Sequence, residues 1–244
     1  MSGTESEESY KVRDIGKAGR SRWRTYTELM TGESRFFALL KYELIVSFFG
    51  AVPGALGLAL RKTFYPSILG SVGKNVVFGR NVIIRHGSKI NIGSDVIFDD
   101  NCVIDAKGGP DSRITIGNGV FVGRNTIVYT KGGEIEIGDN VNIGVNCDIY
   151  SKNRVSIGEN TMVAAYCYIM SGGQYDYQSE TPFYQQNSSS RGPTEIGNSC
   201  WLGAKVTVQD NVTIGARAVV GAGAVVTKNI PEASVAIGVP ARVR

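Results

Sequence analysis

Between Ile92 and Val226, large apolar residues recur in groups of three, and the members of each group are six positions apart. A glycine follows the first member of every group. An α-helix repeats every 3.6 residues and a strand every second residue, so neither produces this spacing. Three short strands around one turn of a parallel β-helix do produce it. The groups are Ile92, Phe98, Ile104; Ile116, Val122, Val128; Ile137, Ile143, Ile149; Ile157, Val163, Ile169; Ile196, Leu202, Val208; and Ile214, Val220, Val226, with Val72, Phe78, Ile84 as an earlier seventh.

The spacing of the corner glycines predicts one long insertion in this array. Gly93, Gly117, Gly138, Gly158, Gly197 and Gly215 are 24, 21, 20, 39 and 18 residues apart. The last interval is a bare coil of three times six residues, so the 39-residue interval contains an excursion, at Gly172–Pro193. A loop of that length inside a repeat array is uncommon without a function.

The sequence therefore predicts a mainly β protein, a parallel β-helix of about seven coils at residues 67–244 with one long loop. Residues 10–66 form a basic and apolar segment with a predicted helix at Arg35–Ser47. Residues 1–9 are predicted to be disordered, because they offer nothing apolar to bury before Tyr10.

The N-terminal segment has two compatible interpretations. Six basic residues and one Asp lie between Lys11 and Arg24, and the apolar run Leu44–Leu60 follows, interrupted by glycines and Pro53. Such a segment can lie on a membrane surface through residues 10–60. It can also cap the open end of the β-helix, whose strand edges are otherwise unpaired. A bilayer span is a third interpretation, although 17 residues are marginal for it.

Composition excludes several kinds of site. The net charge is only +4, and no nucleic-acid-binding motif is present, so no nucleic-acid partner is expected. The chain has four cysteines, each two positions before an inward residue: Cys102, Cys147, Cys167 and Cys200. No two of them form a CxxC motif, and the chain has one histidine. We therefore expect reduced, structural cysteines, no metal site and a cytoplasmic protein. The polar, acidic N-terminus is unlike a secretory signal.

One column of polar residues has a structural interpretation. The six-residue register stacks Asn81, Asn101, Asn125 and Asn146 at one corner of successive coils. Asparagine tolerates left-handed backbone, and its amide groups can pair along a stack. We expect this column to carry no chemistry.

Three segments resemble the hexapeptide-repeat acyltransferases, in particular the galactoside, maltose and polysaccharide O-acetyltransferases. They are Ile196–Ala204, Val220–Lys228 and Gly238-Val239-Pro240-Ala241-Arg242. The resemblance covers residues 70–244 and implies a left-handed β-helix, a homotrimer, and acetyl-CoA bound in the groove between neighbouring prisms. It implies that Trp201, Gly203 and Ala204 line the pantetheine and that Gly221 and Ala222 offer space and backbone amides. Lys228 and Arg242 would face the phosphates. The alternative is that these small residues are only corners and that Lys228 is a solvated terminus.

The catalytic base departs from that pattern. Members of the family carry a histidine in the loop, at the position that Gln174 occupies here, and an amide cannot accept the proton of a sugar hydroxyl. The chain's one histidine, His86, is predicted to lie one strand spacing from Asp105, which would orient it as a base. The alternative for His86 is a corner histidine packed beneath the N-terminal helices. Gln174 could position the acceptor, and Tyr175, Asp176 and Tyr177 are candidates for holding a saccharide.

The predicted function is transfer of an acetyl group from acetyl-CoA to a saccharide hydroxyl in polysaccharide or envelope glycan synthesis. The basic, apolar N-terminus suggests a lipid-linked acceptor and peripheral attachment to the inner face of the cell membrane. One alternative is a catalytically inactive β-helix that serves as a scaffold or glycan-binding subunit. Another is N-acetylation of an amino sugar.

Overall fold

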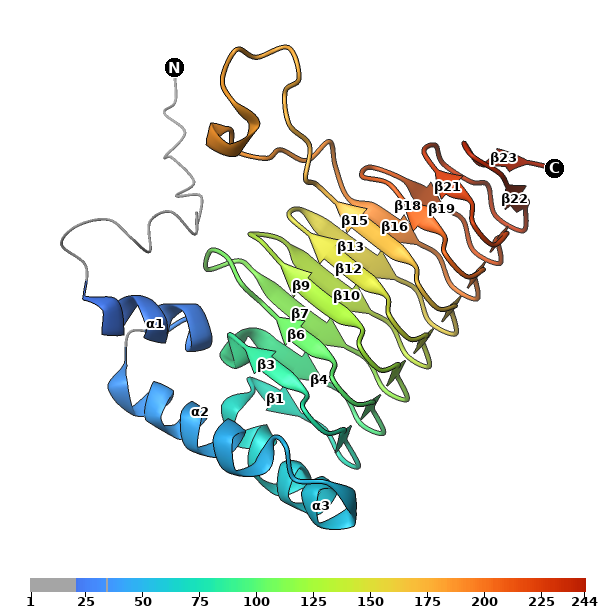
Figure 1. Cartoon of the computed structure of the whole chain (residues 1–244). Helices are drawn as coiled ribbons and strands as arrows, with labels where there is room; N and C mark the ends of the chain where they lie inside the picture. Colours follow the sequence, from blue (N-terminus) through green and yellow to red (C-terminus); the bar gives the residue numbers. More distant parts are fainter. Residues whose placement is uncertain (1–20, 34) are drawn as a thin grey trace.

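In the computed structural model, which describes residues 21–33 and 35–244, the chain is a parallel β-helix with three helices across its N-terminal end (Figure 1). The helices are α1 (Arg22–Thr31), α2 (Phe36–Phe49) and α3 (Gly54–Phe64). The predicted helix at Arg35–Ser47 is confirmed as α2. Helix α1 was not predicted, because its buried residues are Thr25 and Thr27 and it presents no apolar stripe. The prediction of disorder at 1–9 and the basic residues at 11–20 lie outside the described residues.

The strands form three sheets, one for each face of the prism. Sheet A contains β1 (Ser71–Val72), β4 (Ile90–Ile92), β7 (Arg113–Ile116), β10 (Glu134–Ile137), β13 (Arg154–Ile157), β16 (Thr194–Ile196) and β19 (Thr213–Ile214). Sheet B contains β2 (Val77–Phe78), β5 (Ile97–Phe98), β8 (Phe121–Val122), β11 (Asn142–Ile143), β14 (Met162–Val163), β17 (Trp201–Leu202), β20 (Val219–Val220), β22 (Val235–Ile237) and β23 (Arg242–Val243). Sheet C contains β3 (Ile83–Arg85), β6 (Val103–Asp105), β9 (Ile127–Thr130), β12 (Asp148–Ser151), β15 (Tyr168–Ser171), β18 (Thr207–Val208) and β21 (Val225–Val226).

The apolar residues that recur every six positions form the inward-facing core. All eighteen residues of the six predicted groups are buried, as are Phe78 and Ile84 of the seventh. Equivalent residues pair in register from coil to coil, so that Ile116, Ile137, Ile157 and Ile196 form one continuous stack. In this column the core side chains therefore pack on their own kind from coil to coil.

The asparagine column forms as predicted. Its four members all have positive φ, and their side-chain amides pair from coil to coil at 3.1, 3.3 and 3.1 Å. The left-handed backbone turns each corner, and the amide ladder stabilises the stack of corners.

The cysteines also behave as predicted. All four are free and buried. Burial raises the pKa of the Cys102 thiol to about 12 and also raises the pKa of Cys200. Because the thiolate is the reactive form, these two side chains act as small apolar core residues.

Helices α2 and α3 cap the first coil, as one of the two interpretations predicts. Leu39, Tyr42 and Ile45 of α2 are buried. Arg61 of α3 is also buried and donates to the carbonyl oxygens of Phe78, Phe49 and Val52 at 2.9, 3.0 and 2.8 Å. The bond to Phe78 joins α3 to the open strand edge at β2, which would otherwise expose unpaired groups, and the other two bonds join α3 to the end of α2 and the turn after it. Within the described residues, every helix is too short or too polar to cross a bilayer.

The β-helix continues past Pro231 at its C-terminal end. Ile230 bridges to Ile214, and β22 continues sheet B by one more strand. The chain folds back only after Ile237, where β23 pairs antiparallel with β22. The proline is tolerated because it lies in a corner, where its missing N–H removes no ladder hydrogen bond.

Candidate functional site

The long loop leaves β15 at Gly172 and returns to β16 at Thr194, at the corner between sheets C and A (Figure 1). One buried carboxylate, Asp210 in the next coil, holds both ends of it. Asp210 accepts from the backbone N–H of Gly172 at 2.8 Å, the hydroxyl of Ser190 at 3.0 Å and the backbone N–H of Arg191 at 2.7 Å. The base of the loop is therefore rigidly attached to the prism.

The predicted acceptor residues occupy the first part of this loop. Gln174 is half-buried, and its backbone pairs antiparallel with Ser189 at 3.0 and 2.7 Å. Tyr175 and Tyr177 are exposed. Asp176 accepts from the backbone N–H of Gln178 at 2.9 Å, so one of its oxygens closes a turn of the loop. The structure thus leaves the two tyrosine rings accessible and gives Asp176 a structural contact.

A group of side chains that the sequence analysis missed lies beside the base of the loop, on the outer face of sheet C. It consists of Tyr129, Asp148, Tyr150 and Tyr168, and we call it the tyrosine–aspartate patch. Asp148 pairs in register with Tyr168 of the next coil, and Tyr150 pairs with Tyr129 of the preceding one. The rings of Tyr129 and Tyr150 lie 5.0 Å apart. Only the outward alternation along β9, β12 and β15 could have indicated this patch from the sequence.

The patch adjoins the loop directly. A Cβ atom added at Gly173 would lie 3.5 Å from the Tyr150 ring and 3.5 Å from the Met170 side chain. Lys152 also bonds to the carbonyl oxygen of Ser188, on the returning arm of the loop. The patch and the residues around Gln174 therefore form one surface.

Asp148 is electrostatically unusual. Among the described residues, its buried Oδ1 has no hydrogen-bond partner. Burial raises the pKa of the Asp148 carboxyl, because it disfavours the charged form. Burial and then the Asp148 charge also raise the pKa of Tyr129 and of Tyr168. A desolvated carboxylate without a donor is a stronger base than a solvated one, and a sugar hydroxyl could supply the missing donor.

His86 lies where the sequence predicts, at the corner after β3. Its Nδ1 is 2.7 Å from Oδ1 of Asp105, so the predicted contact between the two residues is confirmed. The ring is also covered. His86 is 3% exposed, and its backbone N–H donates to the carbonyl oxygen of Met30 in α1 at 3.1 Å. A Cβ atom at Gly32, just after α1, would lie 2.7 Å from the ring. The packing beneath the N-terminal helices described by the alternative is therefore present.

His86 and the loop share one edge of the prism but are four coils apart. Sheet C runs β3, β6, β9, β12, β15, which places about 19 Å between them along the axis. Asp148 lies on β12, directly beneath the strand from which the loop leaves.

The predicted acyl-CoA residues divide between two corners. Trp201 is 55% exposed on sheet B, and Gly203 and Gly221 follow at the corner between sheets B and C in successive coils. A Cβ atom at Gly203 would lie 2.6 Å from the backbone nitrogen of Ala222, so close packing of the two coils requires this glycine. Ala204 and Ala222 occupy the same corner. Lys228 is exposed at the other corner, between sheets C and A, and Arg242 is exposed on β23.

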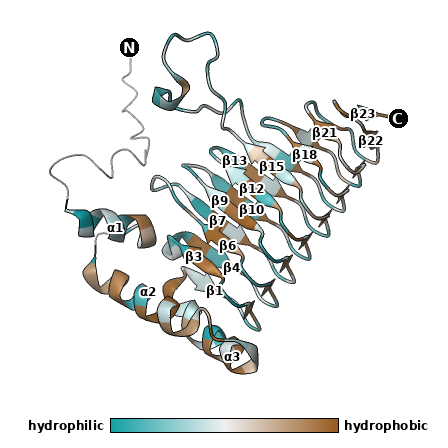
Figure 2. Ribbon diagram, viewed as in Figure 1, coloured by the Kyte–Doolittle hydropathy of each residue, from teal (hydrophilic) through white to brown (hydrophobic). Residues whose placement is uncertain are grey.

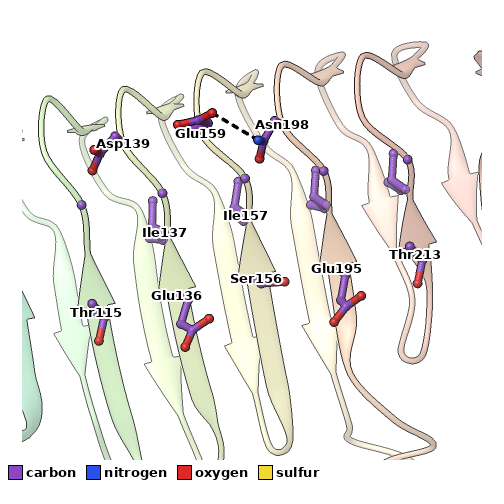
Figure 3. A pocket seen from close by; sticks show the side chains of 17 residues that line it. Thr115, Glu136, Ile137, Asp139, Ser156, Ile157, Glu159, Glu195, Asn198 and Thr213 are labelled. Carbon is purple, nitrogen blue, oxygen red and sulfur yellow. Dashed lines mark hydrogen bonds between the residues drawn. The ribbon is translucent and has the colours of Figure 1, made fainter. Parts of the chain in front are cut away.

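A groove of about 860 Å³ runs along sheet A and its corner glycines (Figure 3). Its lining includes Glu136, Asp139, Glu159 and Glu195. Glu136 is bound by Arg154 at 2.6 Å, and Glu159 accepts from Asn198 at 3.2 Å. Carboxylates repel an anionic ligand such as coenzyme A, so this groove is an unsuitable site for it. It contains none of the predicted site residues.

Two repeat families match the prism. "Bacterial transferase hexapeptide (six repeats)" matches residues 193–228, and "hexapeptide repeat of succinyl-transferase" matches residues 134–171. The fold and these two matches thus make the prism similar to hexapeptide-repeat β-helix proteins.

Individual relatives are named for acetyl transfer. The chain is 38% identical over 122 residues to a Staphylococcus aureus protein named as an acetyltransferase, covering 43% of this chain and 61% of the relative. It is 33% identical over 132 residues to the galactoside O-acetyltransferase of Escherichia coli, covering 53% and 62%. The match thus spans less than two thirds of each relative.

A solved structure shares the fold. It is a mutant of AntD, an N-acyltransferase from Bacillus cereus, in complex with dTDP and coenzyme A. The TM-score is 0.51 at 23% identity, covering 74% of this chain and 86% of that one. Together these findings confirm the predicted resemblance to the hexapeptide-repeat acyltransferases.

Proposed function

We propose that this protein transfers an acetyl group from acetyl-CoA to a hydroxyl group of a saccharide. The observation that carries the proposal is the tyrosine–aspartate patch, an unpaired carboxylate among aromatic rings at the base of the one long loop. The similarity to a galactoside O-acetyltransferase supports the donor and the acceptor class. Aromatic rings with a few polar groups are also the usual lining of a site for a small organic ligand.

We assign the role of base to Asp148. Its carboxylate would accept the proton of the sugar hydroxyl while the hydroxyl oxygen attacks the carbonyl carbon of the thioester. The carbon–sulfur bond then breaks, and the proton passes to the leaving thiolate, which gives an acetyl ester and free coenzyme A. Gln174 would hold the acceptor by a hydrogen bond, and the exposed rings of Tyr175 and Tyr177 would contact the saccharide. Base function at His86, oriented by Asp105, is the competing proposal.

We also propose a binding site for acetyl-CoA and a homotrimeric assembly. Trp201 and the small residues at the corner between sheets B and C would line the pantetheine, and Lys228 and Arg242 would face the phosphates. The outer face of sheet B is partly apolar, with Ile97, Met162 and Trp201 each more than 40% exposed, whereas sheet A presents polar side chains. A homotrimer would cover this apolar face and put a second prism beside each donor groove. Sedimentation equilibrium should then give three times the mass of the chain.

The experiment is a thiol-release assay. Purified protein is mixed with acetyl-CoA and either galactosides or amino sugars, and products are identified by mass spectrometry. Release of coenzyme A that depends on a hydroxyl acceptor supports the proposal, and acetylation of the amine instead identifies an N-acetyltransferase. Saccharide binding without thiol release favours the inactive scaffold. Absence of both acetyl-CoA binding and turnover overturns the proposal.

A further inference from the structure

The helical cap has a second apolar face that nothing in the described structure covers. Helix α2 is apolar on nearly all sides, and only its inner residues Leu39, Tyr42 and Ile45 are buried. Figure 2 shows hydrophobic residues along α2 and α3, interrupted by hydrophilic stretches. The outward residues and their exposed fractions are Phe37 80%, Phe48 66%, Leu56 66%, Phe36 51%, Leu44 49%, Leu40 41% and Phe64 38%. Monomeric soluble proteins seldom expose a contiguous apolar surface of this kind.

This outer face is hollowed between the two helices. A groove of about 500 Å³ is lined by Phe37, Leu40, Lys41, Leu44, Ile45, Phe48, Phe49 and Phe64. Its one charged residue, Lys41, donates from Nζ to the backbone carbonyl of Ser67, so the ammonium group lies at the edge. The groove is therefore an apolar surface with a cation beside it.

Positive charge lies beside the face. From Arg35 to Phe64 the exposed cations are Arg35, Lys41 and Lys62, because Arg61 is buried against the prism. The one carboxylate of this range, Glu43, accepts from the Tyr26 hydroxyl at 2.7 Å. The sequence just before α1 adds Lys11, Arg13, Lys17 and Arg20 against one Asp. Each basic residue near an anionic bilayer contributes about 1 kcal/mol to binding.

The combination of apolar face and cationic rim selects one occupant. A second copy of the cap would bring the same positive charges together, which opposes self-association. An anionic lipid surface satisfies both features, because acyl chains accept the phenylalanine and leucine side chains while the headgroups pair with the cations. The helices are too short to insert across the bilayer, so they fit a position in its plane.

We propose that α2 and α3 dock this protein on an anionic membrane surface, with the outward side chains of α2 inserted at the headgroup boundary. The prism then projects away from the membrane, because the cap lies across its end (Figure 1). The loop lies about 19 Å beyond the first coil. If the proposed transferase activity holds, the acetylated sugar is therefore a distal unit of a lipid-linked glycan rather than the unit attached to the lipid.

Vesicle co-sedimentation of the full chain tests the docking. The wild type should sediment with vesicles that contain phosphatidylglycerol, much less with phosphatidylcholine alone, and progressively less as salt increases. The double variant Phe37→Ser/Phe48→Ser should lose partitioning by about tenfold or more. Phe183→Ser removes another exposed phenylalanine, from the long loop, and should bind like the wild type. Circular dichroism checks that each variant is folded.

Three outcomes overturn the proposal. The first is a wild type that stays in solution with anionic vesicles, and the second is a double variant that still sediments with them. The third is a double variant with an altered oligomeric state, because the face would then be a contact between copies. The vesicles contain neither acetyl-CoA nor a saccharide, so this result is independent of the transferase assay.

Discussion

The two residues proposed as the base, His86 and Asp148, lie in opposite environments on the prism. At the first coil, His86 is paired with Asp105 at 2.7 Å and covered by the residues around Met30 and Gly32. Beside the fifth coil, Asp148 has a buried oxygen without a partner and lies next to a long loop and three tyrosines. A group whose hydrogen bonds are satisfied contributes to stability, whereas an unsatisfied one is available to a ligand.

The largest expected effect is on turnover. Asp148→Asn should lower kcat/KM by about 10²- to 10⁴-fold, because an amide cannot accept the hydroxyl proton. The thiol-release assay measures this, and Glu159→Gln, which changes a carboxylate at the corner after β13, serves as the matched control. A folded Asp148→Asn variant with wild-type turnover would remove Asp148 from the mechanism.

The second largest effect should be on the attachment of the long loop to the prism, when Asp210 is replaced. Asp210→Ala leaves the donors of Gly172, Ser190 and Arg191 without an acceptor, at a cost of about 3 kcal/mol. Hydrogen exchange of the amides in 172–193 should accelerate, and KM for the saccharide should rise. Asp210→Asn keeps one acceptor oxygen and should give an intermediate result. Unchanged exchange in the alanine variant would show that other contacts hold the loop.

Replacing His86 should lower the stability of the fold more than it lowers turnover. His86→Ala removes the partner of Asp105 and opens a cavity beneath α1, so we expect a loss of about 2 kcal/mol in urea denaturation. Turnover per folded molecule should stay within about twofold of the wild type, since His86 would make no contact with the substrate. His86→Asn can retain the hydrogen bond and should be less destabilised. A hundredfold loss of turnover in folded protein would instead identify His86 as the base.

The smallest effect is the dependence of stability on pH. The folded-state pKa of Asp148 is raised above its ordinary 3.8, so folding favours the protonated form. This contribution is fully present below pH 3.8 and is lost as the pH rises through the raised pKa. Asp148→Asn should therefore be slightly more stable than the wild type at neutral pH, and the gain should vanish in acid.

Titration of the Asp148 carboxyl should also determine how activity depends on pH. Because the ionised carboxylate is the base, kcat/KM should fall as the pH decreases through the raised pKa of Asp148. Tyr129 and Tyr168, whose own pKa values are raised, stay neutral throughout this range and should not contribute a second step. An acid limb that persists in Asp148→Asn would assign the titration to another group.

The sequence by itself determined the prism. Its six-residue period specified the inward residues, the corner glycines located the loop at 172–193, and the asparagine positions predicted the amide ladder. It also predicted the contact between His86 and Asp105, which are neighbours one coil apart. These features are local or repeat at a fixed interval, so strand geometry alone carries them from sequence to space.

Only the tertiary structure decided which polar and apolar side chains are accessible to a ligand. The burial of His86 depends on α1, which has no apolar stripe to predict where it packs. The patch around Asp148 depends on outward side chains from three strands, whose types follow no period. The sequence did not indicate which face of α2 packs on the prism, because the helix is apolar on both faces. Burial and pairing are set by contacts between segments distant in sequence, and a repeat pattern does not encode those contacts.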